Sequence, residues 1–317
     1  MTGRAGTIHI LTGCTAAGKT EVALRWAERT GAEIISCDSL LFYRGMDIGT
    51  AKPSLADRRR IPHHLIDVLE VTERMDVVRY ARLAEEAARG ISARGRPILV
   101  VGGSGFYLRG FFSAVADEIE VGGELRRQVA SRLATEGLPA LLEELRRRNP
   151  EGLGGLDTAN PRRVARALER CLASGRTLAE LGRTFAAQPA PFAGWVVKLA
   201  RVERSAEALD ARIAARTRAM LEAGLIGEVD RLAAAGLRDN PSAARAIGYR
   251  EVLAWRAAPG SPGEALPRAA DLARLADAIV RSTRALVKKQ RTWFRTQLPA
   301  HPLLPPDSDP PAGWFES

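Results

Sequence analysis

Residues 13–20 read Gly-Cys-Thr-Ala-Ala-Gly-Lys-Thr, which is a complete G-x-x-x-x-G-K-T phosphate loop. Its glycines let successive backbone amides turn toward one anion, and the helix that follows adds the positive end of its dipole. Lys19 is expected to neutralise the terminal phosphate, and the Thr20 hydroxyl to hold Mg²⁺. We therefore predict that a diphosphate or triphosphate binds to the whole loop, that is, to Gly13, Cys14, Thr15, Ala16, Ala17, Gly18, Lys19 and Thr20.

A carboxylate, Asp38, directly follows an apolar run at residues 33–37. At the tip of a strand that faces a phosphate loop, such a group can bind Mg²⁺, orient water or act as a general base. The alternative is a structural role, in which Asp38 caps the helix that follows. The next segment, residues 39–53, has little periodicity but many functional side chains, as binding loops often do.

A glycine-rich turn at residues 102–107, Gly-Gly-Ser-Gly-Phe-Tyr, offers the Ser104 hydroxyl on a flexible backbone. The turn could receive the polar edge of a substrate, because its glycines allow close approach. It could equally be an ordinary strand-to-helix connection.

Two arginine-rich stretches, residues 160–166 and 283–295, each put several cations on one predicted helix. The second stretch also contains aromatic side chains, which suit base stacking or docking of the helix. A solvated helix face is the other interpretation of both stretches. Arg212 and Arg216 stand four residues apart on a further predicted helix, so they share a face that suits an oligophosphate.

The elements that must position these residues alternate along the first third of the chain. Apolar runs at 7–12, 33–37 and 97–101 alternate with helical patterns, which indicates a parallel sheet with crossover helices. In such folds ligands lie beyond the carboxyl ends of the strands. Asp38 and Ser104 occupy such ends, so we expect both to face the crevice that contains the phosphate loop.

The predicted fold class is α/β, with a P-loop NTPase-like parallel sheet core and an inserted all-helical domain. We expect the core over residues 1–113 and 196–298. Residues 114–195 are rich in Glu, Arg, Leu and Ala with helical spacing, which indicates the insertion. Residues 299–317 cluster Pro, Asp and Ser and are expected to form a poorly ordered tail.

The net charge of +10 favours a polyanionic partner such as nucleic acid, although an arginine-biased proteome gives the same excess. No stretch reaches the roughly 18 uninterrupted apolar residues that a membrane helix needs, so no membrane partner is expected. The 3 cysteines lack metal-ligand spacing, which favours a reduced, cytoplasmic protein.

Taken together, these motifs resemble the tRNA dimethylallyltransferases, also called tRNA isopentenyltransferases, from the phosphate loop to about Arg295. The family usually has Pro where Cys14 stands, commonly Ser at Ala17, and Thr at Ser104. None of these differences removes a group that carries the chemistry. The blocks that carry the resemblance are residues 13–20, 35–39, 43–53, 63–67, 102–107, 246–251 and 283–295.

The resemblance implies transfer of a dimethylallyl group from dimethylallyl diphosphate to N6 of the adenosine immediately 3′ of the anticodon, position 37. The tRNAs concerned read codons that begin with U. The resemblance also implies a helical insertion that clasps the anticodon stem-loop. We expect Mg²⁺ as the cofactor and a monomer as the working form.

By the same resemblance, Asp38 accepts a proton from adenine N6 or hydrogen-bonds to it, Thr15 reaches the diphosphate, and Arg216 helps to neutralise the leaving group. The stacked adenine must be flipped into the site at a cost on the order of a few kcal/mol. Residues at tRNA-contacting family positions are expected to recover this cost. They are Asp38, Ser39, Leu40, Leu41, Ser104, Arg126, Arg162, Arg163, Val164, Ala165 and Arg166.

Two other functions are compatible with parts of the sequence. A small-molecule kinase is the default for an isolated phosphate loop, but it needs an acceptor hydroxyl site and a base pocket, for which we identify no motif. A non-catalytic tRNA-binding protein would leave the intact loop and Asp38 without a purpose.

Overall fold

The structure, a computed structural model, describes residues 6–115, 119–258, 268–308 and 314. The chain divides into a core unit, made of Met1–Phe112 and Pro191–Ser317, and a helical unit, Ser113–Ala190. Residues 191–195, which we expected in the insertion, thus fall in the core unit. The reason is aromatic packing, because Phe192 stacks on Phe111 with ring centroids 4.2 Å apart.

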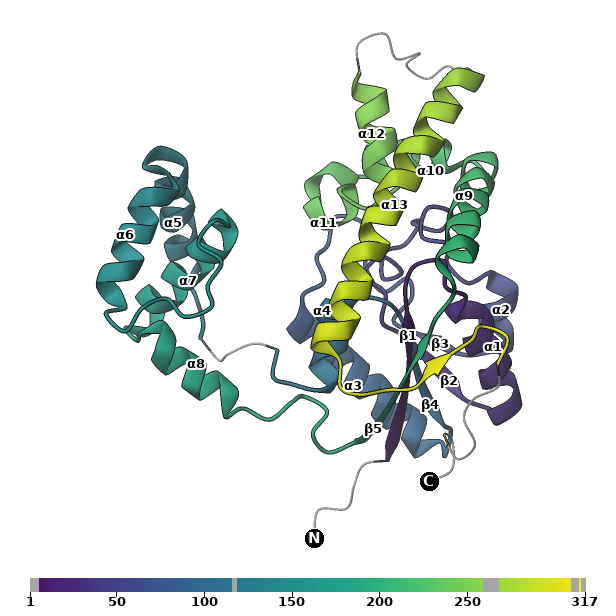
Figure 1. Cartoon of the computed structure of the whole chain (residues 1–317), viewed down its shortest axis with the longest axis horizontal. Helices are drawn as coiled ribbons and strands as arrows, with labels where there is room; N and C mark the ends of the chain where they lie inside the picture. The colour runs from purple at the N-terminus through teal and green to yellow at the C-terminus, as the bar shows by residue number, and fades with distance from the viewer. Residues whose placement is uncertain (1–5, 116–118, 259–267, 309–313, 315–317) are drawn as a thin grey trace. The chain divides into compact units, whose positions relative to one another are not determined.

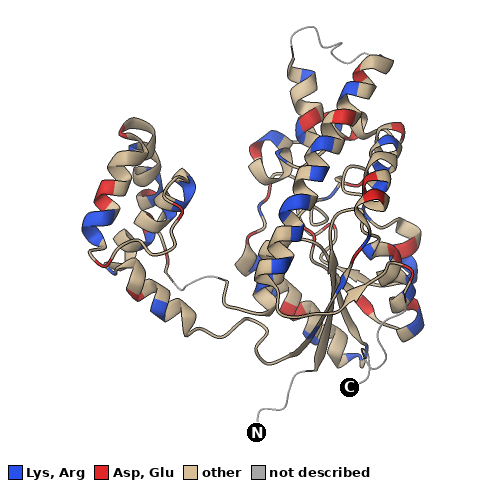
Figure 2. Ribbon diagram, viewed as in Figure 1, with Lys and Arg blue, Asp and Glu red and all other residues tan. Residues whose placement is uncertain are grey.

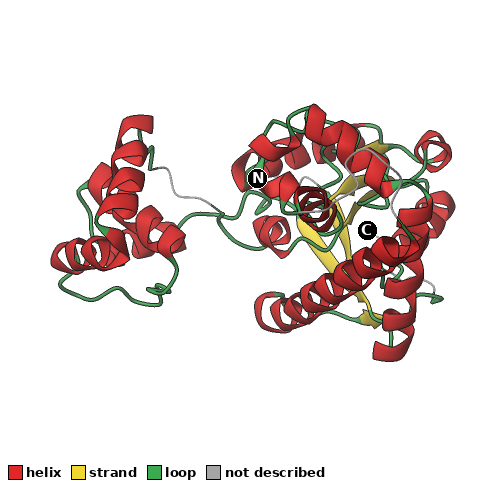
Figure 3. Ribbon diagram, turned by 90° about the horizontal axis from the view of Figure 1, so that it is seen from above, coloured by secondary structure: helices red, strands yellow, loops and turns green. Residues whose placement is uncertain are grey.

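The core unit is built on a six-stranded parallel sheet with the order β3-β2-β4-β1-β5-β6 (Figure 1). Helices cover both of its faces (Figure 3). The central strand β1 is apolar and β-branched, as a strand buried on both sides requires. The strands are β1 (Thr7–Gly13), β2 (Glu33–Ser36), β3 (His63–His64), β4 (Ile98–Val101), β5 (Val196–Val202) and β6 (Leu303–Leu304).

The longest helix of the core unit is α13 (Ala269–Gln297), which packs against α9 and α12 and also contacts α4. Its buried residues are spaced mainly by four, which places them on one face. Among the described residues no helix has both the length and the apolar character to cross a bilayer. The other helices are α1 (Lys19–Thr30), α2 (Leu55–Arg60), α3 (Val77–Ala93), α4 (Gly105–Leu108), α9 (Ala206–Glu222), α10 (Leu225–Ala234), α11 (Pro241–Ala244) and α12 (Tyr249–Ala257), with 3₁₀ turns at Arg109–Phe111 and Leu237–Asp239.

The segment after α13 continues the sheet. Strand β6 pairs in parallel with β5, and the Glu203 amide donates to the Leu304 carbonyl over 2.9 Å. The buried Trp314 packs edge-on against Trp26, with ring centroids 4.7 Å apart. The expectation of a poorly ordered tail therefore does not hold for 299–308 and Trp314. The reason is that the two apolar residues of β6 add a strand to the edge of the sheet beside β5. The rest of the predicted tail, 309–313 and 315–317, lies outside the described residues.

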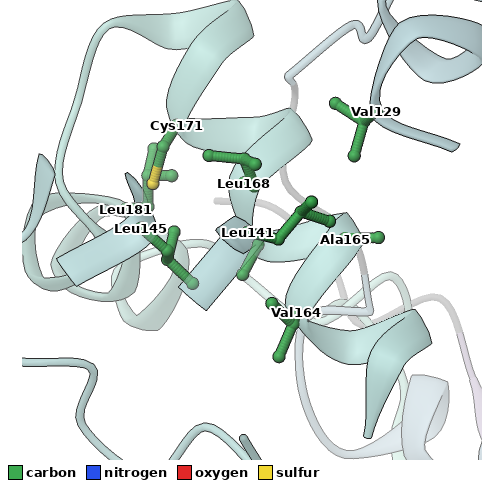
Figure 4. Close-up of a cluster of buried hydrophobic side chains, with 9 residues drawn as sticks. Val129, Leu141, Leu145, Val164, Ala165, Leu168, Cys171 and Leu181 are labelled. Carbon is green, nitrogen blue, oxygen red and sulfur yellow. The ribbon is translucent and has the colours of Figure 1, made fainter. Parts of the chain in front are cut away.

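The helical unit has a hydrophobic core of its own (Figure 4). Four side chains on two facing helices, Leu141, Leu145, Val164 and Leu168, are completely buried there. Asn149 joins two of the helices, because its side chain donates to the Leu145 carbonyl over 2.7 Å and accepts from the Leu178 amide. The helices are α5 (Gly123–Thr135), α6 (Gly137–Arg148), α7 (Pro161–Ser174) and α8 (Leu178–Ala186).

Candidate active site

The phosphate loop connects the end of β1 to the start of α1, and its backbone is constrained at three positions. Gly13 and Gly18 have φ values of 153° and 102°, and a Cβ on Gly13 would stand 2.6 Å from the Val202 carbonyl oxygen. Ala16 adopts φ of 64°, which is uncommon for a residue with a side chain. Backbone strain of this kind is typical of ligand-binding loops.

Lys19 lies at the first position of α1, and its Nζ donates to the carbonyls of Gly13 and Cys14 over 3.0 and 2.8 Å. The pKa of Lys19 is lowered to about 8, mainly by burial and in part by the neighbouring Arg216, while Asp38 opposes the change. The ammonium is therefore a poorly hydrated cation, which a bound diphosphate would stabilise.

Asp38 follows β2 and closes a turn, because its Oδ1 accepts from the Leu40 amide over 3.0 Å. The next helix, α2, begins only at Leu55, so the structural alternative of a helix cap is wrong. The Asp38 charge acts on both Lys19 and Arg216, and it opposes the lowering of their pKa values that burial causes. The structure thus brings this carboxylate close to the two cations that sequence reasoning assigned to the diphosphate.

Arg216 and Arg212 both reach the site from α9, as their four-residue spacing predicts. Arg216 donates to the Thr50 carbonyl over 3.1 Å, and burial lowers the pKa of its guanidinium. Arg212 donates to the Ala16 carbonyl over 3.1 Å and forms an ion pair with Glu21. Since Arg212 is partly neutralised by that carboxylate, Arg216 is the better candidate to stabilise a leaving diphosphate.

A buried carboxylate that sequence reasoning missed, Glu228 of α10, organises the irregular segment 43–53. It accepts from the amides of Asp47, Ile48 and Gly49 over 3.0, 2.7 and 3.1 Å. The Tyr249 hydroxyl also donates to it over 2.6 Å. No motif surrounds Glu228 in the sequence, so no local signal could have found it.

Lys52 fixes the other end of the same segment. Its almost completely buried ammonium pairs with Asp47 at 2.6 Å and Asp67 at 2.5 Å, and it donates to the Tyr43 carbonyl. Because Thr50 lies between these anchors, its carbonyl is held in place for Arg216. The segment is therefore a rigid support for the site, although its sequence predicted only a binding loop.

The turn after β4 approaches both the phosphate loop and Asp38. A Cβ on Gly102 would lie 2.0 Å from the Cys37 carbonyl oxygen, so only glycine fits there. The Ser104 amide donates to the same carbonyl over 3.4 Å. Ser104 and Asp38 therefore lie at the ends of two adjacent strands, β4 and β2. The three residues that follow Asp38 were also expected to contact tRNA, and none of them is buried: Ser39, Leu40 and Leu41.

A second residue that sequence reasoning did not single out is Gln290 of α13. Its Oε1 accepts from the Thr15 amide and its Nε2 donates to the Gly103 carbonyl, each over 3.0 Å. The stretch 283–295 was interpreted from its cations and aromatic side chains, and Figure 2 shows Lys and Arg recurring along α13. Those interpretations gave no role to the uncharged polar residue within the stretch.

The arginines predicted to bind tRNA lie in the helical unit. Arg162, Arg163 and Arg166 line an open groove of about 570 Å³ beside the N-terminus of α7, and Arg126 is exposed on α5. Val164, which was expected to contact tRNA, is completely buried in the core of the unit. That expectation is wrong for its side chain, because helical spacing turns position 164 inward. The adjacent Ala165 is also buried, at 9% exposure.

Comparison with known proteins identifies the family. A family profile described as IPP transferase matches residues 41–297, and one described as isopentenyl transferase matches residues 6–69. A tRNA dimethylallyltransferase from Opitutus terrae is 59% identical over 93% of this chain and 91% of its own. A tRNA dimethylallyltransferase from Rhodococcus jostii is 40% identical over 91% and 88%.

Solved structures agree with the sequence comparison. The tRNA isopentenylpyrophosphate transferase from Bacillus halodurans has a TM-score of 0.62 and 30% identity, covering 98% of this chain and 93% of its own. A eukaryotic dimethylallyltransferase acting on tRNA has a TM-score of 0.76 at 23% identity, over 91% and 70%, which supports the fold. With the α/β core and its phosphate loop in place, the chain belongs to the tRNA dimethylallyltransferase family, as its motifs predicted.

Proposed function

We propose that this protein transfers the dimethylallyl group of dimethylallyl diphosphate to N6 of adenosine 37, next to the anticodon, in tRNAs that read U-initial codons. The observation that carries the proposal is that the carboxylate of Asp38, which follows β2, acts electrostatically on both Lys19 at the start of α1 and Arg216 of α9. One carboxylate near two cations at a phosphate loop provides a place for a proton and a place for an anionic leaving group.

In the proposed reaction, the bond between the allylic carbon and the diphosphate oxygen breaks and a bond from N6 to that carbon forms. The electron pair of the broken bond leaves with the diphosphate, where Lys19, Arg216 and the loop amides stabilise the developing charge. Thr15 contacts the diphosphate. Asp38 takes the proton that N6 loses, which raises the nucleophilicity of a nitrogen whose lone pair is delocalised.

We propose that Mg²⁺ assists through Thr20. Among the residues described, no group of three or more His, Cys, Asp or Glu side chains could hold a metal. A Mg²⁺ ion at a phosphate loop does not need such a group, because the loop hydroxyl, water molecules and the oxygens of the bound diphosphate can coordinate it. Thr20 is exposed at the start of α1, next to Lys19, and therefore fits that role. The ion would supply further neutralisation of the diphosphate.

Removal of Mg²⁺ with EDTA is expected to lower kcat by about 10²-fold, because the ion contributes several kcal/mol of charge stabilisation. Thr20→Val should reproduce most of this loss and require more Mg²⁺ for half-maximal activity. Thr20→Ser, which keeps the hydroxyl, serves as the control. Full activity in EDTA would contradict the metal's role.

The helical unit is proposed to bind the anticodon stem-loop through its arginine groove. Arg162→Ala should weaken tRNA binding and make the slope of log K against log salt shallower by about one unit or less, because fewer counterions are released. Arg147→Ala, which removes an exposed arginine of α6 outside the groove, should leave the slope unchanged. Equal slopes for Arg162→Ala and wild type would place Arg162 away from the RNA.

The proposal is tested by incubating the protein with labelled dimethylallyl diphosphate and unmodified tRNA, followed by mapping of the labelled nucleotide. Label on adenosine 37 supports it. The kinase alternative is tested in parallel with ATP and candidate acceptors, and phosphate transfer without prenyl transfer would overturn the proposal. Binding of tRNA with neither transfer would favour a non-catalytic role.

We propose that the protein works in the cytoplasm, since its 3 cysteines are all free and buried, as suits a reducing compartment. We also propose that it works as a monomer.

A further inference from the structure

Gln290 joins two parts of the site that come from different strands. The Thr15 amide of the phosphate loop donates to its Oε1, and its Nε2 donates to the Gly103 carbonyl at the end of β4. Both bonds are 3.0 Å long and partly buried. A single uncharged side chain of α13 therefore connects the loop after β1 to the turn that leads into Ser104.

The carboxamide satisfies both ends of this bridge, because it carries an acceptor and a donor side by side. The loop presents an N–H group, which needs an acceptor, and the turn presents a carbonyl, which needs a donor. A carboxylate would lose the bond to Gly103, and an apolar side chain would lose both. The two partners also fix the orientation of the Gln290 amide, with Oε1 toward Thr15 and Nε2 toward Gly103.

The surrounding backbone leaves this bridge little freedom. A Cβ on Gly103 would stand 2.9 Å from the Gly13 carbonyl oxygen and 3.0 Å from the Gln290 Nε2. One turn further along α13, the Trp293 ring lies so close to Gly105 that a Cβ there would be 2.5 Å from it. Gln290 is thus held on a helix that itself packs tightly against the glycine turn.

We propose that Gln290 is a positioning residue, which sets the separation between the diphosphate cradle and the turn after β4, whose Ser104 amide is bonded to the Cys37 carbonyl next to Asp38. The inference rests on the proposed function. Because the Thr15 amide is already bonded to Gln290, the proposal assigns the diphosphate contact of Thr15 to its hydroxyl. Transfer needs the allylic carbon and N6 at near-attack distance, so a shift of the loop against β4 slows the reaction.

The test uses Gln290→Met, which keeps the size of the side chain and removes both hydrogen bonds. Gln297→Met is the matched control, since Gln297 is exposed on the same helix and its amide donates to Thr296. We expect Gln290→Met to lower kcat about 10-fold, with the KM for tRNA unchanged, because the reacting groups are bound but misaligned. The control should keep wild-type kinetics.

Gln290→Glu gives a second, different signature. It keeps an acceptor for Thr15 but puts a negative charge near Lys19, so it should raise the KM for dimethylallyl diphosphate about 10-fold. The dissociation constant of inorganic pyrophosphate, measured by calorimetry, should rise by a similar factor. This binding measurement needs no catalysis, so it tests Gln290 even if wild type proves to transfer no prenyl group.

A kcat for Gln290→Met within twofold of wild type would overturn the inference. So would a loss of kcat that matches a loss of pyrophosphate-binding sites, because the variant would then be partly unfolded rather than misaligned. An unchanged pyrophosphate affinity in Gln290→Glu would show that position 290 does not face the diphosphate, and would overturn it as well.

Discussion

Replacing Asp38 with asparagine is expected to lower kcat by about 10²–10⁴-fold, the usual contribution of a positioned general base. The Kd for tRNA should stay within about threefold of wild type, since a carboxamide oxygen can still accept from the Leu40 amide and keep the turn intact. Single-turnover prenyl transfer and filter binding of tRNA measure the two quantities separately.

Asp307→Asn makes the same chemical change on an exposed residue after β6 and serves as the control. It should leave both quantities unchanged. If Asp38→Asn lost tRNA affinity as strongly as turnover, Asp38 would be an RNA contact and not the proton acceptor.

Lys19→Met is expected to lower kcat/KM for dimethylallyl diphosphate by about 10²–10³-fold, as the loss of one group that stabilises a developing anion does. The affinity of the wild-type enzyme for pyrophosphate should depend on pH because of this residue. Because burial lowers the pKa of Lys19 to about 8, its ammonium form is present below that pH and is lost above it. Pyrophosphate should therefore bind wild type more weakly at pH 9 than at pH 7.

The pH dependence separates Lys19 from other cations. Lys19→Met should bind pyrophosphate weakly at both pH values, whereas Arg82→Met, which removes an exposed cation of α3, should behave as wild type does. A wild-type affinity that is flat from pH 7 to pH 9 would place the ammonium away from the bound anion.

The parts of the site that follow local rules could be predicted from the sequence. The phosphate loop has a fixed spacing, and Asp38 was placed by the general rule that ligands lie at the carboxyl ends of parallel strands. Arg212 and Arg216 were paired by helical periodicity. Each of these inferences needs only neighbouring residues or the alternation of strands and helices.

The parts that depend on long-range packing could not be predicted in this way. Glu228 binds amides about 180 residues earlier in the chain, and Gln290 binds an amide 275 residues earlier, so neither partner is visible in a local pattern. Strand β6 consists of two residues, too few for a periodicity. Val164 was assigned through the resemblance to family positions that contact tRNA, whereas its inward orientation follows from the face that α7 buries.

The strand order has a consequence for how the chain is made. Strand β1 pairs with β4 on one side and β5 on the other, with Thr7 opposite Val196. At roughly 5–20 residues per second, β5 emerges from the ribosome about 10–40 s after β1. Throughout that interval β1 has an unpaired edge. The helical unit, which lies between the two strands in the sequence, has a hydrophobic core that includes neither strand, and its last helix ends at Ala186, shortly before β5. Synthesis therefore completes the helical unit before β5 can pair with β1 and close the sheet of the core unit.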